Sequence, residues 1–164
     1  MEIAILLGLT GDRLPQPLSR AVGVLNADAL VMLGPHDDAY RRDLGVGTVA
    51  GRVTLLSADE VSANPARAAR DAVQRISSRS SNWWLHTDLD VLDEREFSAR
   101  GAPGEVALSG GFSWEQLTEV VRAAVGAGGC RGWSLVIYNP DLDPDRSQAG
   151  RIVQFVTEVA PHLP

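Results

Sequence analysis

Two aspartates, Asp88 and Asp90, stand two residues apart at the end of an apolar segment that begins at Trp83. Side chains at positions i and i+2 of a strand project from the same face, so both carboxylates could reach one cation beyond the strand. The carboxyl ends of parallel strands are where α/β proteins bind their ligands. The pair therefore predicts half of a divalent-metal site, and the alternative is that the acids only cap the following loop.

Three further groups near such chemistry need a separate interpretation. His86 shares the predicted strand face with the two aspartates, as a third ligand or a partner of the ligands, although we favour a buried histidine bonded to the backbone. The segment His36–Asp38 is interpreted as the cap of a short helix. The segment Asp141–Asp145 resembles the start of a calcium loop, but Arg146 and Ile152 occupy the positions that require glycine and glutamate.

Composition excludes several classes of function. The 164 residues carry a net charge of -6 without a basic block, which argues against a nucleic-acid partner. All 15 basic residues are arginines, which excludes chemistry that depends on a lysine amine. The single Cys130 cannot form an internal disulfide, and no apolar run reaches the length of a membrane span. We therefore expect a cytoplasmic protein that does not contact a membrane.

Apolar runs alternate with amphipathic runs along the whole chain, which is typical of β-α-β units. We predict one α/β domain over residues 1–164, with three layers and a mostly parallel sheet whose strands are buried on both faces. A Gly/Pro-rich loop at 101–111 is of the kind that lines a site. The expected strands are 29–33, 46–49, 53–56, 83–88 and 133–138, and the expected helices are 1–9, 38–44, 58–77, 114–125 and 147–159.

Four segments together resemble the C-terminal half of the arginases, agmatinases and formiminoglutamases, the ureohydrolase family. They read LVMLGPHDDAYRRDLGV, HTDLDVLD, GAPGEVALSGGFSWEQL and GWSLVIYNPDLDP, in the order and spacing of that family. The matching motif positions are Asp88, Asp90, Leu92, Asp93, Gly110, Gly111, Phe112, Ser113, Asn139 and Pro140.

The resemblance implies an arginase-like fold and a manganese-dependent hydrolase of C–N bonds in linear amidines or guanidines. Asp88 and Asp90 would each ligate the two Mn²⁺ ions that activate a bridging hydroxide. The implied partners are a small amidino or guanidino substrate and further copies of the chain in a homo-oligomer.

The departures from the family pattern concern the rest of its active site. The family's Gly-Gly-Asp-His and Asp-x-His-x-Asp segments have no counterpart here, and the first eight residues resemble the helix that follows them. Ile137 stands where the family places a glutamate that holds the guanidinium group, so the substrate stays undetermined. Glu94 replaces the proline that usually follows Leu-Asp. We therefore expect a partial ureohydrolase domain without its N-terminal half, without assignable catalytic residues, with weak manganese binding and inactive by itself.

Two other functions are compatible with these residues. The first is a non-catalytic remnant or binding module of the same fold, because two carboxylates alone seldom hold a transition metal tightly. The second is a phosphatase of the haloacid-dehalogenase type, whose strand also ends in Asp-x-Asp. That family requires threonine or valine at the position of Leu92 and a downstream lysine, and the chain contains no lysine.

Overall fold

The computed structural model describes residues 2–10, 14–101 and 109–163. Two pairs of parallel strands form, β1 (Val31–Leu33) with β2 (Thr54–Leu56), and β3 (Trp83–Asp88) with β4 (Cys130–Val136). Parallel strands connected through helices confirm the predicted α/β class. The helices are α1 (Glu2–Leu6), α2 (Asp38–Asp43), α3 (Ala58–Ser62), α4 (Pro65–Ser77), α5 (Trp114–Gly126) and α6 (Ser147–Val159), with 3-10 helices η2 (Leu18–Ala21), η3 (Ala27–Ala29), η4 (Leu89–Val91), η5 (Pro140–Leu142) and η6 (Ala160–His162).

Local capping signals set where the long helices begin. The Asn64 side chain accepts a hydrogen bond from the Arg67 N–H and splits the helix expected over 58–77 into α3 and α4. A capping box forms at α5, where the Ser113 hydroxyl accepts from the Gln116 N–H and the Gln116 side chain accepts from the Ser113 N–H. Short polar side chains that satisfy the free N–H groups of the first turn therefore set where these helices begin.

The strands differ more from expectation than the helices do. The segment 46–49 forms no strand, and glycines at positions 45 and 51 have positive φ angles of 65° and 78°. Such left-handed turns interrupt an extended chain. The last strand begins at Cys130 rather than at residue 133, because its first residue pairs with Trp83 at the start of β3.

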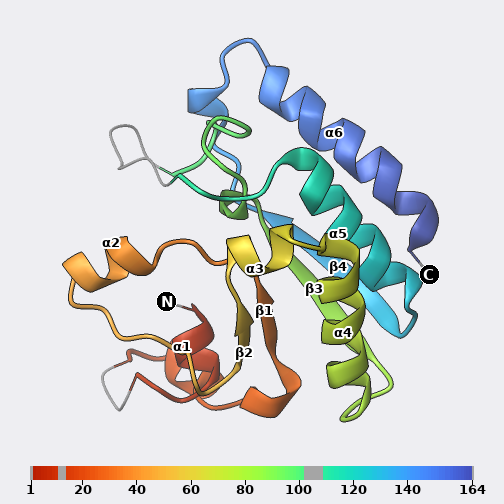
Figure 1. Ribbon diagram of the computed structural model, residues 1–164. Helices are drawn as coiled ribbons and strands as arrows, with labels where there is room; N and C mark the ends of the chain where they lie inside the picture. Colours follow the sequence, from red (N-terminus) through yellow and green to blue (C-terminus); the bar gives the residue numbers. More distant parts are fainter. Residues whose placement is uncertain (1, 11–13, 102–108, 164) are drawn as a thin grey trace.

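Helices α4, α5 and α6 lie next to one another along one side of the strands (Figure 1). The aromatic ring of Phe155 on α6 packs 5.5 Å from Trp133 on β4 and 5.5 Å from Trp114 at the start of α5. The buried side chains of the helices and strands form one hydrophobic cluster. Its largest fully buried apolar side chains are Val61, Leu89, Leu92, Phe97, Phe112, Val121 and Val159.

The opposite face of β3 is open to solvent. Along this strand Trp83 and Thr87 are buried, whereas Trp84 and His86 are exposed. The expectation that the strands are buried on both faces is therefore wrong for β3, because the helices of the described residues cover one face only. None of the helices within the described ranges has the length and apolar character that crossing a membrane requires.

Candidate functional site at the carboxyl end of β3

Asp88 and Asp90 lie at the carboxyl end of β3, but in different backbone structures. Asp88 is the last residue of the strand and is half-buried. Leu89 turns into the core, and Asp90 is exposed within the single turn of η4. The two-residue periodicity of a strand therefore does not apply to Asp90, which corrects the reason for expecting both carboxylates on one face. The prediction that they share a cation stays a prediction.

The loop behind this pair is held in place by Asp93. Its buried carboxylate accepts hydrogen bonds from the Arg95 backbone N–H at 3.0 Å, from the Arg95 side chain at 2.8 Å and 3.3 Å, and from the Gly110 N–H at 2.8 Å. These donors, the Arg95 side chain first, hold the pKa of Asp93 well below its usual range. Asp93 is thus ionised at neutral pH and serves as an anchor between two loops.

Two adjacent glycines, Gly110 and Gly111, allow the loop before α5 to approach the loop that follows Asp90. The Phe112 N–H donates to the Val91 carbonyl and the Asp93 N–H donates to the Phe112 carbonyl, both at 2.9 Å. A Cβ atom on Gly111 would lie 2.5 Å from the Asp93 nitrogen, so no other residue fits there. Gly110 has a φ of +91°, which favours glycine as well. The two glycines therefore let the loop before α5 pack directly against the backbone that follows Asp88 and Asp90.

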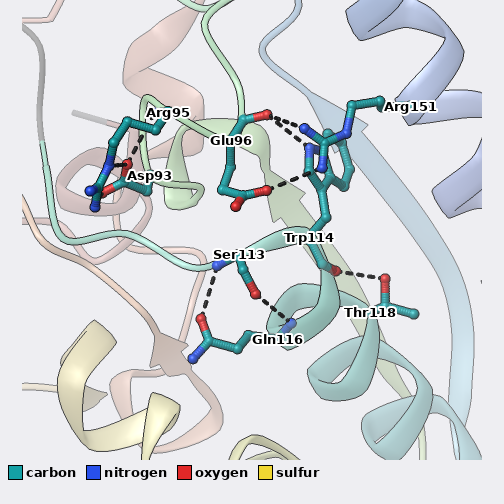
Figure 2. A network of polar contacts seen from close by, with 8 residues as sticks. All are labelled: Asp93, Arg95, Glu96, Ser113, Trp114, Gln116, Thr118 and Arg151. Atoms are coloured by element: carbon teal, nitrogen blue, oxygen red, sulfur yellow. Dashed lines mark hydrogen bonds and ion pairs between the residues drawn. The ribbon is translucent and has the colours of Figure 1, made fainter.

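A network of polar contacts joins the same loop to α5 and α6 (Figure 2). The Glu96 carbonyl accepts from the Trp114 indole N–H and from Arg151, both at 3.0 Å. Arg151 also pairs with the Glu96 carboxylate at 3.1 Å, and its guanidinium carbon lies 5.5 Å from the centre of the Trp114 ring. Helix α6 thereby fixes the polypeptide that follows Asp90.

The structure gives His86 a partner that differs from our interpretation. His86 is exposed rather than buried, and its Nδ1 lies 2.7 Å from the Ser134 hydroxyl on β4, not from a backbone group. The Trp84 indole N–H donates to the same hydroxyl at 3.1 Å. Strand register explains the pairing, since His86 lies directly opposite Ser134. Whether His86 contributes to a metal site stays open as a hypothesis.

The other acidic segments serve the fold. Asp37 stands at the N-cap position of α2 but makes no capping hydrogen bond, and it pairs with Arg41 at 3.1 Å instead. The capping hydrogen bond that this interpretation requires is therefore absent, and the interpretation is wrong on that point. Arg41 binds the Asp37 carboxylate instead and also pairs with Asp38. The preceding His36 has a buried Nε2 without a hydrogen-bond partner among the residues described.

Asp143, inside the segment that resembles a calcium loop, is almost fully buried. Its carboxylate accepts from the N–H groups of Gln148 at 3.0 Å and Ala149 at 2.8 Å, and from the Tyr138 hydroxyl at 3.0 Å. Burial raises the pKa of Asp143, but these donors outweigh burial and leave the pKa below its ordinary value. Asp143 therefore holds the first turn of α6, a role that was not predicted from the sequence.

The residues present do not fit a two-manganese centre by themselves. Within residues 2–10, 14–101 and 109–163, no three histidine, cysteine, aspartate or glutamate side chains converge to hold a metal ion. Two carboxylates leave most of the coordination of such ions unfilled. Most of the predicted loop at 101–111 lies outside the described residues.

Ile137, the position at which the family resemblance places a substrate-holding glutamate, follows directly after β4. Its side chain is 38 % exposed, and its backbone has a φ of +67°. A branched residue in this left-handed region is strained by about 1–3 kcal/mol, and such strain is frequent at binding sites. The aliphatic side chain at this position cannot pair with a cation.

Sequence reasoning missed the contributions of Arg151, Trp114 and Asp143. Arg151 lies 55 residues from its partner Glu96, and no local pattern connects the two. Asp143 had a signal that could have been used, because an aspartate before a helix commonly accepts from its first N–H groups.

Comparison with known proteins agrees with this geometry. The model of the Arginase family matches residues 13–160. The chain is similar to an arginase from Bacillus subtilis, with a TM-score of 0.70 and 19% identity over 97% of this chain and 54% of that one. It is also similar to the Helicobacter pylori arginase, with a TM-score of 0.66 and 15% identity over 92% of this chain and 53% of that one.

A third similar structure is the formimidoylglutamase from Bacillus subtilis, with a TM-score of 0.67 and 15% identity over 92% of this chain and 49% of that one. At these identities the solved structures establish the fold. The chain spans about half the length of each of these three proteins. No curated protein sequence matches the chain.

Proposed function

The chain belongs to the Arginase family, and from this premise we propose that it supplies one half of a hydrolase that cleaves C–N bonds of linear amidines or guanidines. The observation that carries the proposal is the end of β3, where Asp88 and Asp90 precede a loop anchored by Asp93 and Arg151. Such an anchored loop holds carboxylates with the precision that a hydrolytic site requires.

The proposed contribution of this chain is the pair Asp88 and Asp90 as ligands of a manganese site. The remaining ligands would come from polypeptide corresponding to the N-terminal half of the family, which contains its histidine motifs. The described residues offer no third converging ligand, so we expect the 164-residue chain to be inactive by itself. We further propose a homo-oligomeric, cytoplasmic enzyme once both halves are joined.

The substrate proposal is limited by Ile137. An aliphatic side chain cannot form the charge-assisted hydrogen bonds that a guanidinium group requires. We therefore expect arginine and agmatine to be poor substrates of the completed enzyme. The choice among guanidino, amidino and formimino substrates is therefore left to a test with a panel of all three classes.

A non-catalytic binding module of the same fold is the second candidate. It is favoured by the two-carboxylate donor set and by Ile137. The family assignment leaves the phosphatase alternative without support.

The decisive assay measures urea and ammonia release from a panel of guanidino, amidino and formimino compounds with added Mn²⁺. We expect no turnover by the 164-residue chain. Turnover that disappears in the Asp88→Ala/Asp90→Ala double mutant would contradict the proposal that the chain is incomplete.

The complementary assay joins the chain to an N-terminal half that carries the family's Gly-Gly-Asp-His and Asp-x-His-x-Asp segments. We expect this longer protein to hydrolyse at least one compound of the panel, and the double mutant of the longer protein to lose that activity. Inactivity of the folded longer protein towards the whole panel would favour the binding module.

A further inference from the structure

A groove runs between α5 and α6, two helices that contact each other in the helical layer (Figure 1). Its volume of about 810 Å³ is within the range of roughly 300–1,000 Å³ that is typical of small-molecule sites. We propose that this groove binds a linear zwitterion of the ω-amino carboxylate class, with a cationic end, an apolar middle and an anionic end. Neither Asp88 nor Asp90 lines the groove, so this binding is independent of C–N hydrolysis.

One wall of the groove is a stripe of charged side chains on α5. Glu115, Glu119 and Arg122 line it, and their spacing of four and then three residues places them on the same side of the helix. All three residues are exposed. The stripe therefore presents two carboxylates first and a guanidinium group last along the direction of α5.

The floor of the groove is apolar. Trp114 and Phe155 line it, both are buried, and their ring centres are 5.5 Å apart. Ala123 of α5 lines it as well and is half-buried. An aliphatic chain that lies on this floor is removed from water, which favours a ligand with an apolar middle over a compact ion.

Free charges of opposite sign determine the two ends of the ligand. Within the described residues, Glu115, Glu119, Arg122 and His162 line the groove without an ion pair. Like charges four residues apart on a helix repel each other, so a cationic group between Glu115 and Glu119 relieves this repulsion. Two helical turns, a rise of about 10 Å, separate Glu115 from Arg122, which can bind a carboxylate. The cationic and anionic ends of the ligand are therefore about 10 Å apart.

The groove also extends to residues that hold the loop after Asp90. Trp114 and Arg151 line the groove, and both donate hydrogen bonds to the Glu96 carbonyl at 3.0 Å (Figure 2). A ligand on the floor of the groove therefore touches the donors of this loop. Its binding should be detectable at the Trp114 indole N–H.

The test is a titration of the 164-residue chain with ω-aminooctanoate, followed by calorimetry and by the NMR signals of the tryptophan indole N–H groups. We expect saturable binding that shifts the Trp114 signal, which Trp114→Phe assigns. The signal of Trp84, on the exposed face of β3, should not move. Octanoate and octylamine each carry one of the two charges and should bind about fivefold more weakly, the effect of one exposed ion pair. The short γ-aminobutyrate cannot span the two ends and should bind as weakly.

Substitutions locate the two ends. Arg122→Gln and Glu119→Gln should each weaken the binding of ω-aminooctanoate about fivefold, because each removes one exposed ion pair with the ligand. The matched controls are Arg70→Gln and Asp59→Asn, which remove the same charges at exposed positions outside the groove. Both controls should bind like the parent. Circular dichroism confirms that each variant is folded.

The proposal is overturned if ω-aminooctanoate does not bind, or if octanoate or octylamine binds as tightly. Equal weakening by the two control variants would show that net charge, rather than the groove, attracts the probe. A shift of the Trp84 signal with an unchanged Trp114 signal would place the probe on the opposite face and refute the site as well. The titration needs neither a metal ion nor turnover, so its failure leaves the proposed hydrolase function untouched.

Discussion

At the scale of single residues, Asp93 is the acid on which the candidate site depends without being part of it. Its folded-state pKa lies below the value of about 3.9 for an unfolded aspartate. Its charge therefore contributes stability above about pH 4, and this contribution is lost as the pH falls towards the folded-state pKa. Because the Arg95 side chain is exposed, solvent screens its ion pair with Asp93 and reduces the contribution of that pair to stability. The Asp93 carboxylate also accepts a hydrogen bond from the backbone N–H of Gly110.

We predict that Asp93→Asn lowers the free energy of unfolding at pH 7 by about 2 kcal/mol, since hydrogen bonds to a charged group are lost. The variant should also show a smaller fall in stability below pH 4 than the parent. Urea denaturation between pH 3 and pH 7 measures both effects, with Glu94→Gln, an exposed neighbour, as the control. Equal pH dependence of parent and Asp93→Asn would contradict this role.

At the scale of elements, the start of α6 depends on a side chain three residues before the N-cap. Asp143 accepts from two N–H groups of the first turn, while the N-cap residue Arg146 provides no side-chain hydrogen bond and has a φ of +62°. Helix α6 carries Phe155, which packs in the core, and Arg151, which binds Glu96 in the loop after Asp90. A stable first turn of α6 therefore helps to hold both contacts.

We predict that Asp143→Ala destabilises the protein by about 2 kcal/mol, because it leaves helix N–H groups without their acceptor. Asp141→Ala, in the exposed part of the same segment, should change stability little. Thermal unfolding followed by circular dichroism measures both variants. Added Ca²⁺ should not shift the midpoint of the parent, and a rise that Asp143→Ala abolishes would restore the calcium interpretation.

At the scale of the whole molecule, the described residues pack one hydrophobic core against one face of β3, whereas Trp84 and His86 on its opposite face are exposed. The open face and the edge with Asp88 and Asp90 meet at the same place. The two carboxylates thus lie at the end of the strand rather than inside the packed core.

We predict weak manganese binding by the 164-residue chain. Two carboxylates without imidazole donors hold a transition metal poorly. Calorimetric titration with Mn²⁺ should show no saturating two-ion isotherm, and the Asp88→Ala/Asp90→Ala double mutant should abolish the weak signal. Tight binding of two ions per chain would show that the described residues form a more complete site than their geometry indicates.

The sequence by itself determined the α/β class, the strand 83–88 and the start of α5 at Ser113. These features follow from local causes, since hydrophobic periodicity and capping side chains act within a few residues. Motif order along the chain also determined the family. The position of Asp88 and Asp90 at the end of a strand was predictable for the same reason, although the turn into η4 at Leu89 was not.

Only the tertiary structure decided the contacts that join distant segments. His86 meets Ser134 across 48 residues, Arg151 reaches Glu96 across 55, and Asp93 binds the Gly110 N–H across 17. No periodic pattern encodes such pairs, because they depend on strand register and on how helices pack. The exposure of Trp84 is of this kind as well. The sequence pattern of an apolar strand is the same whether its second face is covered or exposed. Only the folded chain shows whether a helix covers that face.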